Sequence, residues 1–256
     1  MEFVEVETGY FVPPQEEPLV KLVGDNLPSY EFKGVPAFFD VGGLCCNPES
    51  FSAAIDVLYS RYKNKDLTSI CCVDARGFLF GPALALRLGI PFFMARKSGK
   101  LPGLVLETKY KTEYSEDSLS IPCNSVHPED RVLIVDDLLG TGGTARAAVH
   151  LVRSSKGIPV EVAVVITIPS LRGWVGLVEN NVSVFAIVES YSTPAMPSGS
   201  TSSAILSGGS KKHVAVLEAM TAGGPRGHVL QQVGEDRFAH VPLCLEKNSK
   251  YKPISS

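Results

Sequence analysis

The stretch VDDLLGTGGTA, residues 135–145, joins two adjacent aspartates to a loop of glycine and threonine. Residues 132–135 before the acids are all apolar, and apolar side chains recur at helical spacing after 144, so the stretch predicts strand, turn and helix. Glycines allow close approach of the backbone, and the amides of residues 140–144 can then turn inward around an anion. The start of the following helix adds partial positive charge, which favours a phosphate group there.

Two common phosphate-binding patterns do not describe this loop. No lysine follows the glycines as in a Walker loop, and the spacing is not that of a G-x-G-x-x-G dinucleotide site. Backbone amides and hydroxyl groups must therefore hold the phosphate without a lysine. The predicted phosphomonoester site consists of Gly140, Thr141, Gly142, Gly143 and Thr144.

Asp136 and Asp137 call for a different partner, because ionised carboxylates only accept hydrogen bonds. Vicinal hydroxyls, such as the 2′-OH and 3′-OH of ribose, are suitable neutral donors. A ribose 5-phosphate would span the stretch, with its phosphate in the loop and its diol on the two carboxylates. The spacing alone leaves open that the acids cap a helix or lie in a surface turn.

Apolar runs alternate with amphipathic segments along the middle of the chain. The expected strands are 69–74, 90–95, 132–137, 160–168 and 182–189, and the expected helices are 49–63, 77–89 and 144–157. This alternation predicts an α/β fold with a doubly wound parallel sheet. Such sheets bind ligands at the carboxyl ends of their strands. We expect the following residues just past these strand ends: Arg76, Arg96 and the two acids.

The composition of the chain argues against several classes of protein. The chain has 256 residues and a net charge of −3, so it lacks the basic field of a nucleic-acid binder. No apolar run reaches the length of a membrane helix, and the acidic N-terminus is unlike a signal peptide. The six cysteines include two doublets without zinc-site spacing, which indicates reduced thiols. A cytoplasmic protein is expected, with import into an organelle left open.

The longer pattern resembles a known family. VLIVDDLLGTGGTA resembles the phosphoribosyl pyrophosphate signature of type I phosphoribosyltransferases. DARGFLFGPALALRLGIPFFMARKSGKLPG (74–103) and YKTEYSEDSLSI (110–121) resemble adenine phosphoribosyltransferases, and GVPAFFDVGGLCCNPESF (34–51) is similar to their base-binding stretch. The likeness covers roughly residues 30–190. The long lead and tail are similar to the longer kinetoplastid forms.

The resemblance implies a fold, a reaction and partners. The fold is the type I phosphoribosyltransferase fold, a central parallel sheet flanked by helices with a small N-terminal hood and a C-terminal extension. The reaction is purine salvage: adenine and phosphoribosyl pyrophosphate give AMP and pyrophosphate. Mg²⁺ arrives on the substrate, without a dedicated protein metal site, and the enzyme is a homodimer.

The family resemblance, together with the composition of the chain, predicts three parts. Residues 1–48 form an N-terminal extension and the base-binding hood, and residues 49–190 form the phosphoribosyltransferase core. Residues 191–256 form a linker and C-terminal extension, because 192–212 are rich in serine, glycine and proline. The tail is expected to pack on the core or on a second subunit.

Site residues are carried over by matching positions. The pyrophosphate-binding group is Ala75, Arg76, Arg96, Lys97 and Lys100. Glu113 is the implied catalytic acid or base, because the purine nitrogen exchanges a proton during the reaction, and Tyr114 covers the site as part of a lid. The adenine-binding group is the Ala37 carbonyl, the Phe38 ring and the Phe39 amide.

The sequence also departs from the family pattern. None of residues 36–40 is the arginine that many members carry there, Gly140 stands where alanine is common, and Gly42–Gly43 replaces a more polar stretch. Two alternatives therefore stay open at this point. One is a phosphoribosyltransferase for 6-oxopurines, and the other is a non-catalytic regulator that senses phosphoribosyl pyrophosphate. The presence of Arg96, Lys97, Glu113 and Tyr114 favours an enzyme, since a sensor needs no acid in its lid.

Overall fold

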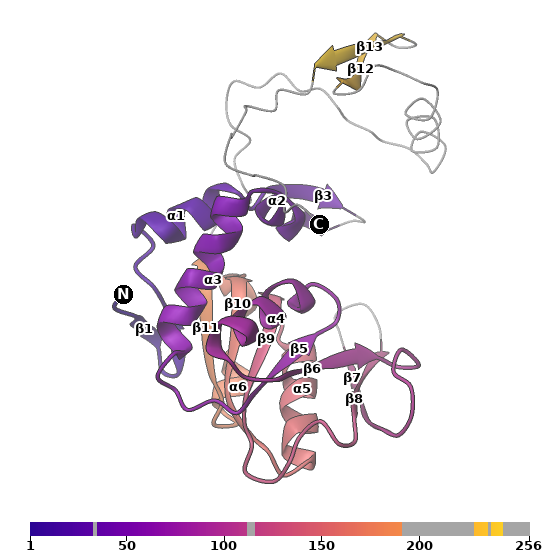
Figure 1. Cartoon of the computed structure of the whole chain (residues 1–256). Helices are drawn as coiled ribbons and strands as arrows, with labels where there is room; N and C mark the ends of the chain where they lie inside the picture. The colour runs from indigo at the N-terminus through magenta and orange to yellow at the C-terminus, as the bar shows by residue number, and fades with distance from the viewer. Residues whose placement is uncertain (33–34, 112–115, 191–227, 235–236, 243–256) are drawn as a thin grey trace, which may run out of the picture. The chain divides into compact units, whose positions relative to one another are not determined.

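The computed structural model of the chain describes residues 1–32, 35–111, 116–190, 228–234 and 237–242 (Figure 1). Contacts divide the chain into two units, Met1–Met196 and Pro197–Ser256. In the second unit, β12 (His228–Gly234) and β13 (Arg237–Pro242) pair as an antiparallel ribbon. The predicted linker at 192–212 lies outside the described residues, and the packing of the tail stays a prediction.

A nine-stranded sheet forms the centre of the first unit. The six neighbouring strands from β2 to β6 pair in parallel, whereas β1, β8 and β7 pair antiparallel at the two edges. In spatial order the strands are β1 (Val4–Glu7), β2 (Tyr10–Val12), β11 (Ser183–Glu189), β10 (Ile158–Thr167), β9 (Arg131–Leu139), β5 (Ser69–Val73), β6 (Phe92–Lys97), β8 (Glu116–Pro122) and β7 (Val105–Lys111). The predicted α/β fold with a central parallel sheet is confirmed, and all five expected strands are present.

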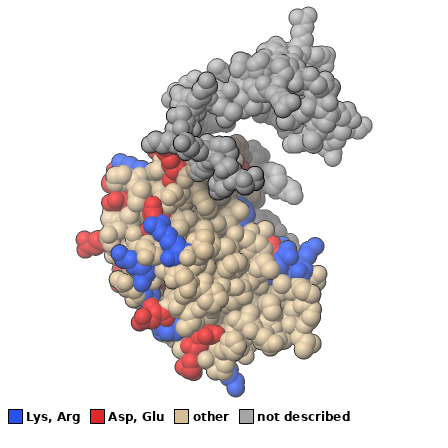
Figure 2. Space-filling view, in the orientation of Figure 1, with Lys and Arg blue, Asp and Glu red and all other residues tan. Residues whose placement is uncertain are grey.

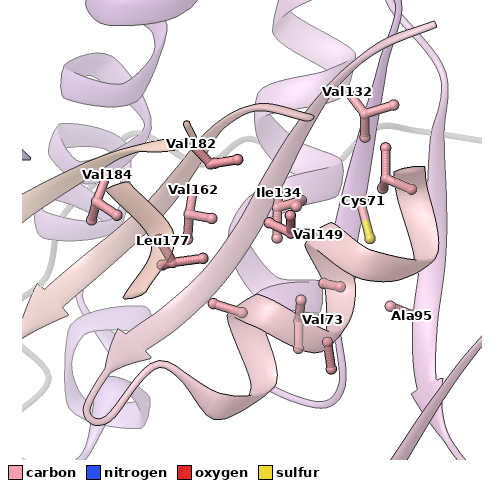
Figure 3. Close-up of a cluster of buried hydrophobic side chains, with 14 of the residues drawn as sticks. Cys71, Val73, Ala95, Val132, Ile134, Val149, Val162, Leu177, Val182 and Val184 are labelled. Atoms are coloured by element: carbon pink, nitrogen blue, oxygen red, sulfur yellow. The ribbon is translucent and has the colours of Figure 1, made fainter. Parts of the chain in front are cut away.

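Helices cover both faces of this sheet (Figure 1). One face packs on α5 (Gly143–Ser154) and α6 (Val175–Val178), and the other packs on α1 (Pro18–Asp25), α3 (Pro48–Tyr62) and α4 (Gly77–Leu88). Alternation along β5 builds both cores, since Cys71 and Val73 pack towards α5 whereas Ile70 and Cys72 pack towards α4. Figure 3 shows Cys71 and Val73 beside Ile134 of β9 and Val149 of α5.

The ends of the helices follow from local chemistry. The Asn47 side chain accepts hydrogen bonds from the amides of Glu49 and Ser50, and Pro48 begins α3. Gly89 ends α4 in the left-handed conformation, with φ of 70°. None of the helices in the described part has the length and apolarity needed to cross a bilayer.

Two strands extend further than their apolar runs predict. The ladder between β9 and β10 continues to the pair Leu139–Thr167, so Asp136 and Asp137 lie inside β9 rather than past its end. Likewise Arg96 lies inside β6, because it pairs with Ser120 of β8. Pairing with a neighbouring strand, which the hydrophobic pattern does not record, extends both elements.

The hood consists of a small hairpin and a short helix. The strands β3 (Ser29–Phe32) and β4 (Val35–Phe39) pair antiparallel in a sheet of their own. Asp40 then caps α2 (Val41–Cys46) by accepting a hydrogen bond from the amide of Gly42. Phe39, at the end of β4, is buried in the core that also contains Val135 of β9. The end of β4 is therefore anchored in the same core as the acid-bearing strand.

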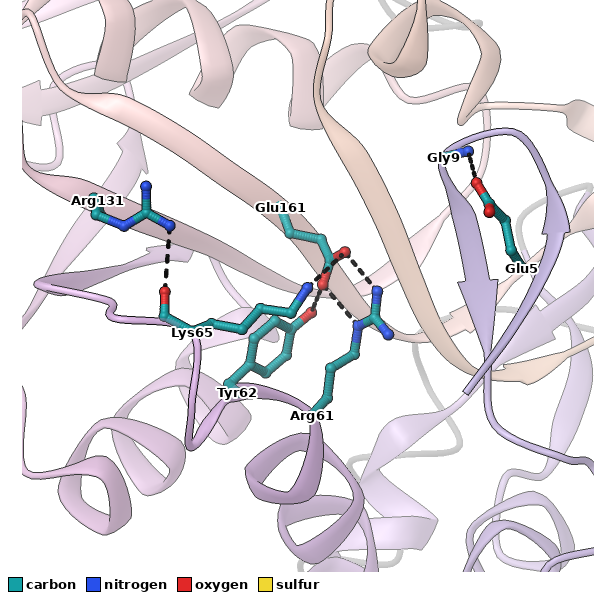
Figure 4. Close-up of polar contacts among 7 residues, drawn as sticks. All are labelled: Glu5, Gly9, Arg61, Tyr62, Lys65, Arg131 and Glu161. Atoms are coloured by element: carbon teal, nitrogen blue, oxygen red, sulfur yellow. Dashed lines mark hydrogen bonds and ion pairs between the residues drawn. The ribbon is translucent and has the colours of Figure 1, made fainter. Parts of the chain in front are cut away.

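A buried ion pair attaches α3 to the sheet (Figure 4), and its carboxylate residue on β10 pairs with Leu133, three residues before Asp136. Two guanidinium nitrogens of Arg61 donate to Glu161 of β10 at 2.8 and 2.7 Å, and the Tyr62 hydroxyl donates to the same carboxylate at 2.7 Å. Burial raises the pKa of Tyr62 well above its usual value. Because the Glu161 carboxylate accepts three hydrogen bonds, two of them from a cation, this charged cluster is compatible with a buried position.

Candidate active site

A cavity of about 610 Å³ opens at the carboxyl ends of the parallel strands. Its walls come from β4, β6, β7, β8, β9, β10, the turn between β5 and α4, and the loop before α5 together with the start of α5. The lining residues are Phe38, Phe39, Asp74, Ala75, Arg76, Lys97, Tyr110, Asp117, Asp136, Asp137, Leu138, Leu139, Gly140, Thr141, Gly142, Gly143, Thr144, Ala145, Val164, Ile168 and Leu171. The cavity therefore lies where ligands bind in parallel α/β sheets.

The acid pair is the most unfavourable electrostatic feature of this cavity. Asp137 is 4% exposed, and Asp136 is partly exposed. Burial, together with the charge of Asp137, raises the pKa of Asp136 well above its usual value. Burial also raises the pKa of Asp137, although the cation of Arg76 opposes that shift. Two adjacent carboxylates with raised pKa values cost folding free energy, and such shifts in a cavity are typical of functional sites.

Few hydrogen bonds are available to these carboxylates inside the protein. Oδ1 of Asp136 accepts the amide of Asp137 at 2.9 Å. Oδ2 of Asp137 is buried and has no partner with hydrogen-bond geometry, although Nε of Arg76 forms an ion pair with it at 2.9 Å. Unsatisfied acceptors beside a cavity suit a ligand that carries hydroxyl donors.

The glycine loop is fixed by close backbone packing. Gly142 has φ of 78°, and a Cβ atom there would lie 2.4 Å from the carbonyl oxygen of Gly173. Only glycine fits this position, both in conformation and in space. The next residue, Gly143, begins α5, which has no side-chain cap and no acid in its first turn. The positive end of α5 is therefore available to an anion, and all five predicted loop residues line the cavity.

Only some of the residues predicted to bind pyrophosphate line the cavity. Ala75, Arg76 and Lys97 line the cavity, whereas Arg96 and Lys100 are absent from its wall. The Asp74–Ala75 peptide is cis. Lys97 pairs with Asp117 at 2.8 Å, and this hydrogen bond is the main cause of the raised pKa of Lys97.

Arg96 is held beside the cavity by its own partners. Its Nε forms an ion pair with Asp74 at 3.0 Å, and its Nη1 donates to the carbonyl of Lys100 at 3.2 Å. The guanidinium also lies 5.8 Å from the ring centroid of Phe78. The pyrophosphate role of Arg96 and Lys100 stays a prediction.

The base-binding and lid residues are only partly described. Phe38 and Phe39 line the cavity opposite the acid-bearing strand. Ala37 belongs to β4, but its side chain is outside the described part. Glu113 and Tyr114 lie outside the described residues, so their catalytic and lid roles stay predictions.

Among the lining residues that were not singled out from the sequence, Asp74, Tyr110 and Asp117 have polar side chains. Asp117 places a carboxylate next to Lys97, and the acid-rich run EYSED contains the signal for it. Tyr110 accepts a hydrogen bond of 3.4 Å from the Thr144 hydroxyl and so connects β7 to the phosphate loop. It belongs to the same YKTEY segment as the predicted lid. By contrast, nothing in the sequence indicates that Gly173 would pack against the loop.

Comparison with known proteins agrees with this geometry. The phosphoribosyl transferase domain family matches residues 46–198. The adenine phosphoribosyltransferase of Histophilus somni (strain 2336) is 40% identical over 171 residues, which are 67% of this chain and 95% of that protein. The chain belongs to the adenine phosphoribosyltransferase family. The fold and reaction implied by the sequence resemblance are thereby confirmed.

Solved adenine phosphoribosyltransferases have the same architecture. The Trypanosoma brucei enzyme, crystallised with AMP, pyrophosphate and ribose-5-phosphate, gives a TM-score of 0.70 at 31% identity, covering 85% of this chain and all 100% of that one. The Leishmania tarentolae enzyme gives 0.69 at 32% identity, over 73% and 94% of the two chains. This adenine phosphoribosyltransferase is a purine-salvage transferase that makes AMP from adenine and phosphoribosyl pyrophosphate.

The raised pKa of Asp136 predicts that the site reduces the stability of the fold. In the unfolded chain this carboxyl ionises near pH 4, whereas in the fold its pKa is higher. Ionisation of Asp136 therefore lowers the free energy of unfolding increasingly as the pH rises above about 4, and it has no effect on stability below that pH. Asp136→Asn is expected to unfold at higher urea concentration than the wild type at pH 7, with the difference shrinking as the pH falls towards 4.

Urea titrations monitored by circular dichroism at both pH values measure this effect. Asp66→Asn, a change at an exposed aspartate, is the control for loss of one negative charge. A variant of Asp136 that is less stable than the wild type at pH 7 would contradict the assigned cost.

Proposed function

We propose that the transfer takes place in this cavity, on one phosphoribosyl pyrophosphate molecule that spans the end of β9. The observation that supports this most strongly is that the acid pair and the uncapped start of α5 share one wall. The 5-phosphate binds the amides and hydroxyls of residues 140–144, and the ribose diol donates to Asp136 and Asp137. The anomeric carbon then faces the base-binding strand β4.

The leaving pyrophosphate needs cations beside the breaking bond. Arg76 and Lys97 on the cavity wall serve this purpose, with the Ala75 backbone, Arg96 and Lys100 beside them. Mg²⁺ carried by the substrate would supply further positive charge beside the leaving group, in addition to these side chains. Among the described residues no group of three or more metal-ligating side chains exists.

Adenine binds against Phe38, with the Ala37 carbonyl accepting its exocyclic amine and the Phe39 amide donating to the ring. An accepting carbonyl disfavours 6-oxopurines, which lack that donor. The transition state is oxocarbenium-like, as in other reactions at an anomeric carbon. Glu113 exchanges the purine proton, and Tyr114 excludes water when the lid closes.

Pyrophosphate release from phosphoribosyl pyrophosphate and Mg²⁺ tests this proposal, with adenine, hypoxanthine, guanine and xanthine as separate acceptors. Adenine alone is expected to support turnover. Glu113→Gln is expected to lower kcat by about 100-fold or more, because a positioned acid or base contributes at least that much. The Kd of phosphoribosyl pyrophosphate should stay within about twofold, because Glu113 acts on the base rather than on the sugar phosphate.

The matched control is Glu179→Gln, an exposed glutamate at the end of α6, which should leave kcat unchanged. Turnover with a 6-oxopurine but not with adenine would overturn the base assignment. Equal losses of kcat and of substrate affinity in Glu113→Gln would refute its role as acid or base.

We also propose that the enzyme is a homodimer in the cytoplasm, joined through an apolar face on α4 and β6. Leu79, Leu86, Phe92 and Met94 are exposed by 42%, 86%, 47% and 40%. Phe92 and Met94 pair with residues of β5 whose side chains pack under α4, so all four lie on one face. Figure 2 presents a broad area without charged side chains where Figure 1 has α4 and β6. The five described cysteines are free thiols, which suits a reducing compartment.

Sedimentation equilibrium tests the dimer. The wild-type protein is expected at twice the mass of one chain at micromolar concentration, and Leu86→Glu at the mass of a single chain, because a buried charge disrupts an apolar interface. Leu104→Glu, at another exposed leucine outside this face, should remain dimeric. A wild-type monomer, or dimeric Leu86→Glu, would refute this interface.

A further inference from the structure

Arg76 connects three parts of the site that come from different elements. It lies in the turn after β5 and is the N-cap residue of α4. Its Nε lies 2.9 Å from Oδ2 of Asp137, and its Nη1 donates to the carbonyl of Phe39 at 3.3 Å. Its guanidinium carbon lies 5.0 Å from the ring centroid of Phe38. One side chain therefore contacts both the proposed sugar-binding acid and the proposed base-binding strand.

These contacts require the geometry of a guanidinium group. A planar cation can present two donors along its edges and stack its face on an aromatic ring at the same time. A lysine ammonium is a compact charge, and it can satisfy Asp137 without the stacked contact and the second fixed donor. The contact with Asp137 depends on charge, whereas the contacts with β4 depend on shape.

The link matters because the two strands belong to separate sheets. β4 pairs only with β3 among the described strands, and β9 is in the centre of the nine-stranded sheet. No backbone ladder in the described part fixes the distance between them. In the transfer reaction this distance sets how far the base lies from the anomeric carbon, and small errors in such a distance reduce the rate strongly.

We propose that Arg76 is a positioning residue that holds the base-binding strand in register with the ribose-binding acid. This inference rests on the proposed function, and it gives Arg76 a role beyond contact with pyrophosphate. Arg76 fixes the Phe38 ring and the Phe39 peptide relative to Asp137, so that a base and a sugar joined in one molecule fit both sites together.

AMP separates this role from that of a pyrophosphate ligand. AMP contains the base, the ribose and the 5-phosphate but no pyrophosphate. If Arg76 bound only pyrophosphate, its replacement would leave AMP affinity unchanged. If Arg76 only supported Asp137, AMP and ribose 5-phosphate would lose affinity equally.

Calorimetric titration of the full-length protein with AMP, ribose 5-phosphate and pyrophosphate provides the test. In Arg76→Lys the Kd of AMP is expected to rise about tenfold or more, the range for coupled contacts, while the Kd of ribose 5-phosphate stays within about threefold because the charge beside Asp137 remains. The matched control is Arg87→Lys. Arg87 also pairs with a carboxylate, that of Asp56, and lies 4.6 Å from the ring centroid of Tyr59, but it does not line the cavity, so AMP affinity should not change.

Phe38→Leu completes a double-mutant cycle. It should weaken AMP binding in the wild-type background and have little further effect in Arg76→Lys, because both changes break the same contact. Unchanged AMP affinity in Arg76→Lys, equal losses for AMP and ribose 5-phosphate, or additive effects in the cycle would each overturn the positioning role. Failure of the wild-type protein to bind AMP would instead refute the proposed function, and thermal unfolding identifies any variant that does not fold.

Discussion

The site depends on one constraint: two adjacent carboxylates are held in the interior of the sheet, directly before a tight loop and a helix start. Asp136 and Asp137 lie inside β9, where burial raises the pKa of both groups. The fold offsets part of this cost with the cation of Arg76. The remaining hydrogen-bonding capacity of the two carboxylates suits a ligand that donates hydroxyl hydrogens. In the proposed function, the feature that destabilises the free protein therefore favours substrate binding.

Close backbone packing keeps the surrounding loops compact. A Cβ atom on Gly77 would lie 2.5 Å from the carbonyl oxygen of Val135, so α4 begins in contact with β9. On the other side, the loop after β9 packs against Gly173. The segments that carry Arg76, the two acids and the phosphate loop therefore meet within one cavity, and the positive end of α5 faces the same space. A preorganised arrangement of this kind needs little movement when the reaction begins.

Sequence reasoning succeeded where local pattern determines structure. The apolar run before Asp136, the glycines of the loop and the helical spacing after Thr144 each specify their own element, and the parallel sheet follows from their alternation. It did not extend β6 through Arg96, because pairing with Ser120 depends on a distant strand. The same limit applies to Arg76, whose partners Asp137 and Phe39 are far away in the sequence. The spacing of residues indicates which groups reach the site, but not which of them contact one another.

The central claim is that a single sugar phosphate spans the end of β9, with its diol on the carboxylates and its ester in the loop. Calorimetric comparison of ribose 5-phosphate with 2-deoxyribose 5-phosphate, at fixed pH and ionic strength, tests this claim most directly. The deoxy sugar lacks one donor to a buried charged acceptor, so its Kd should be about tenfold higher or more. Equal affinities for the two sugars would mean that the acids do not bind the diol, and would contradict the account.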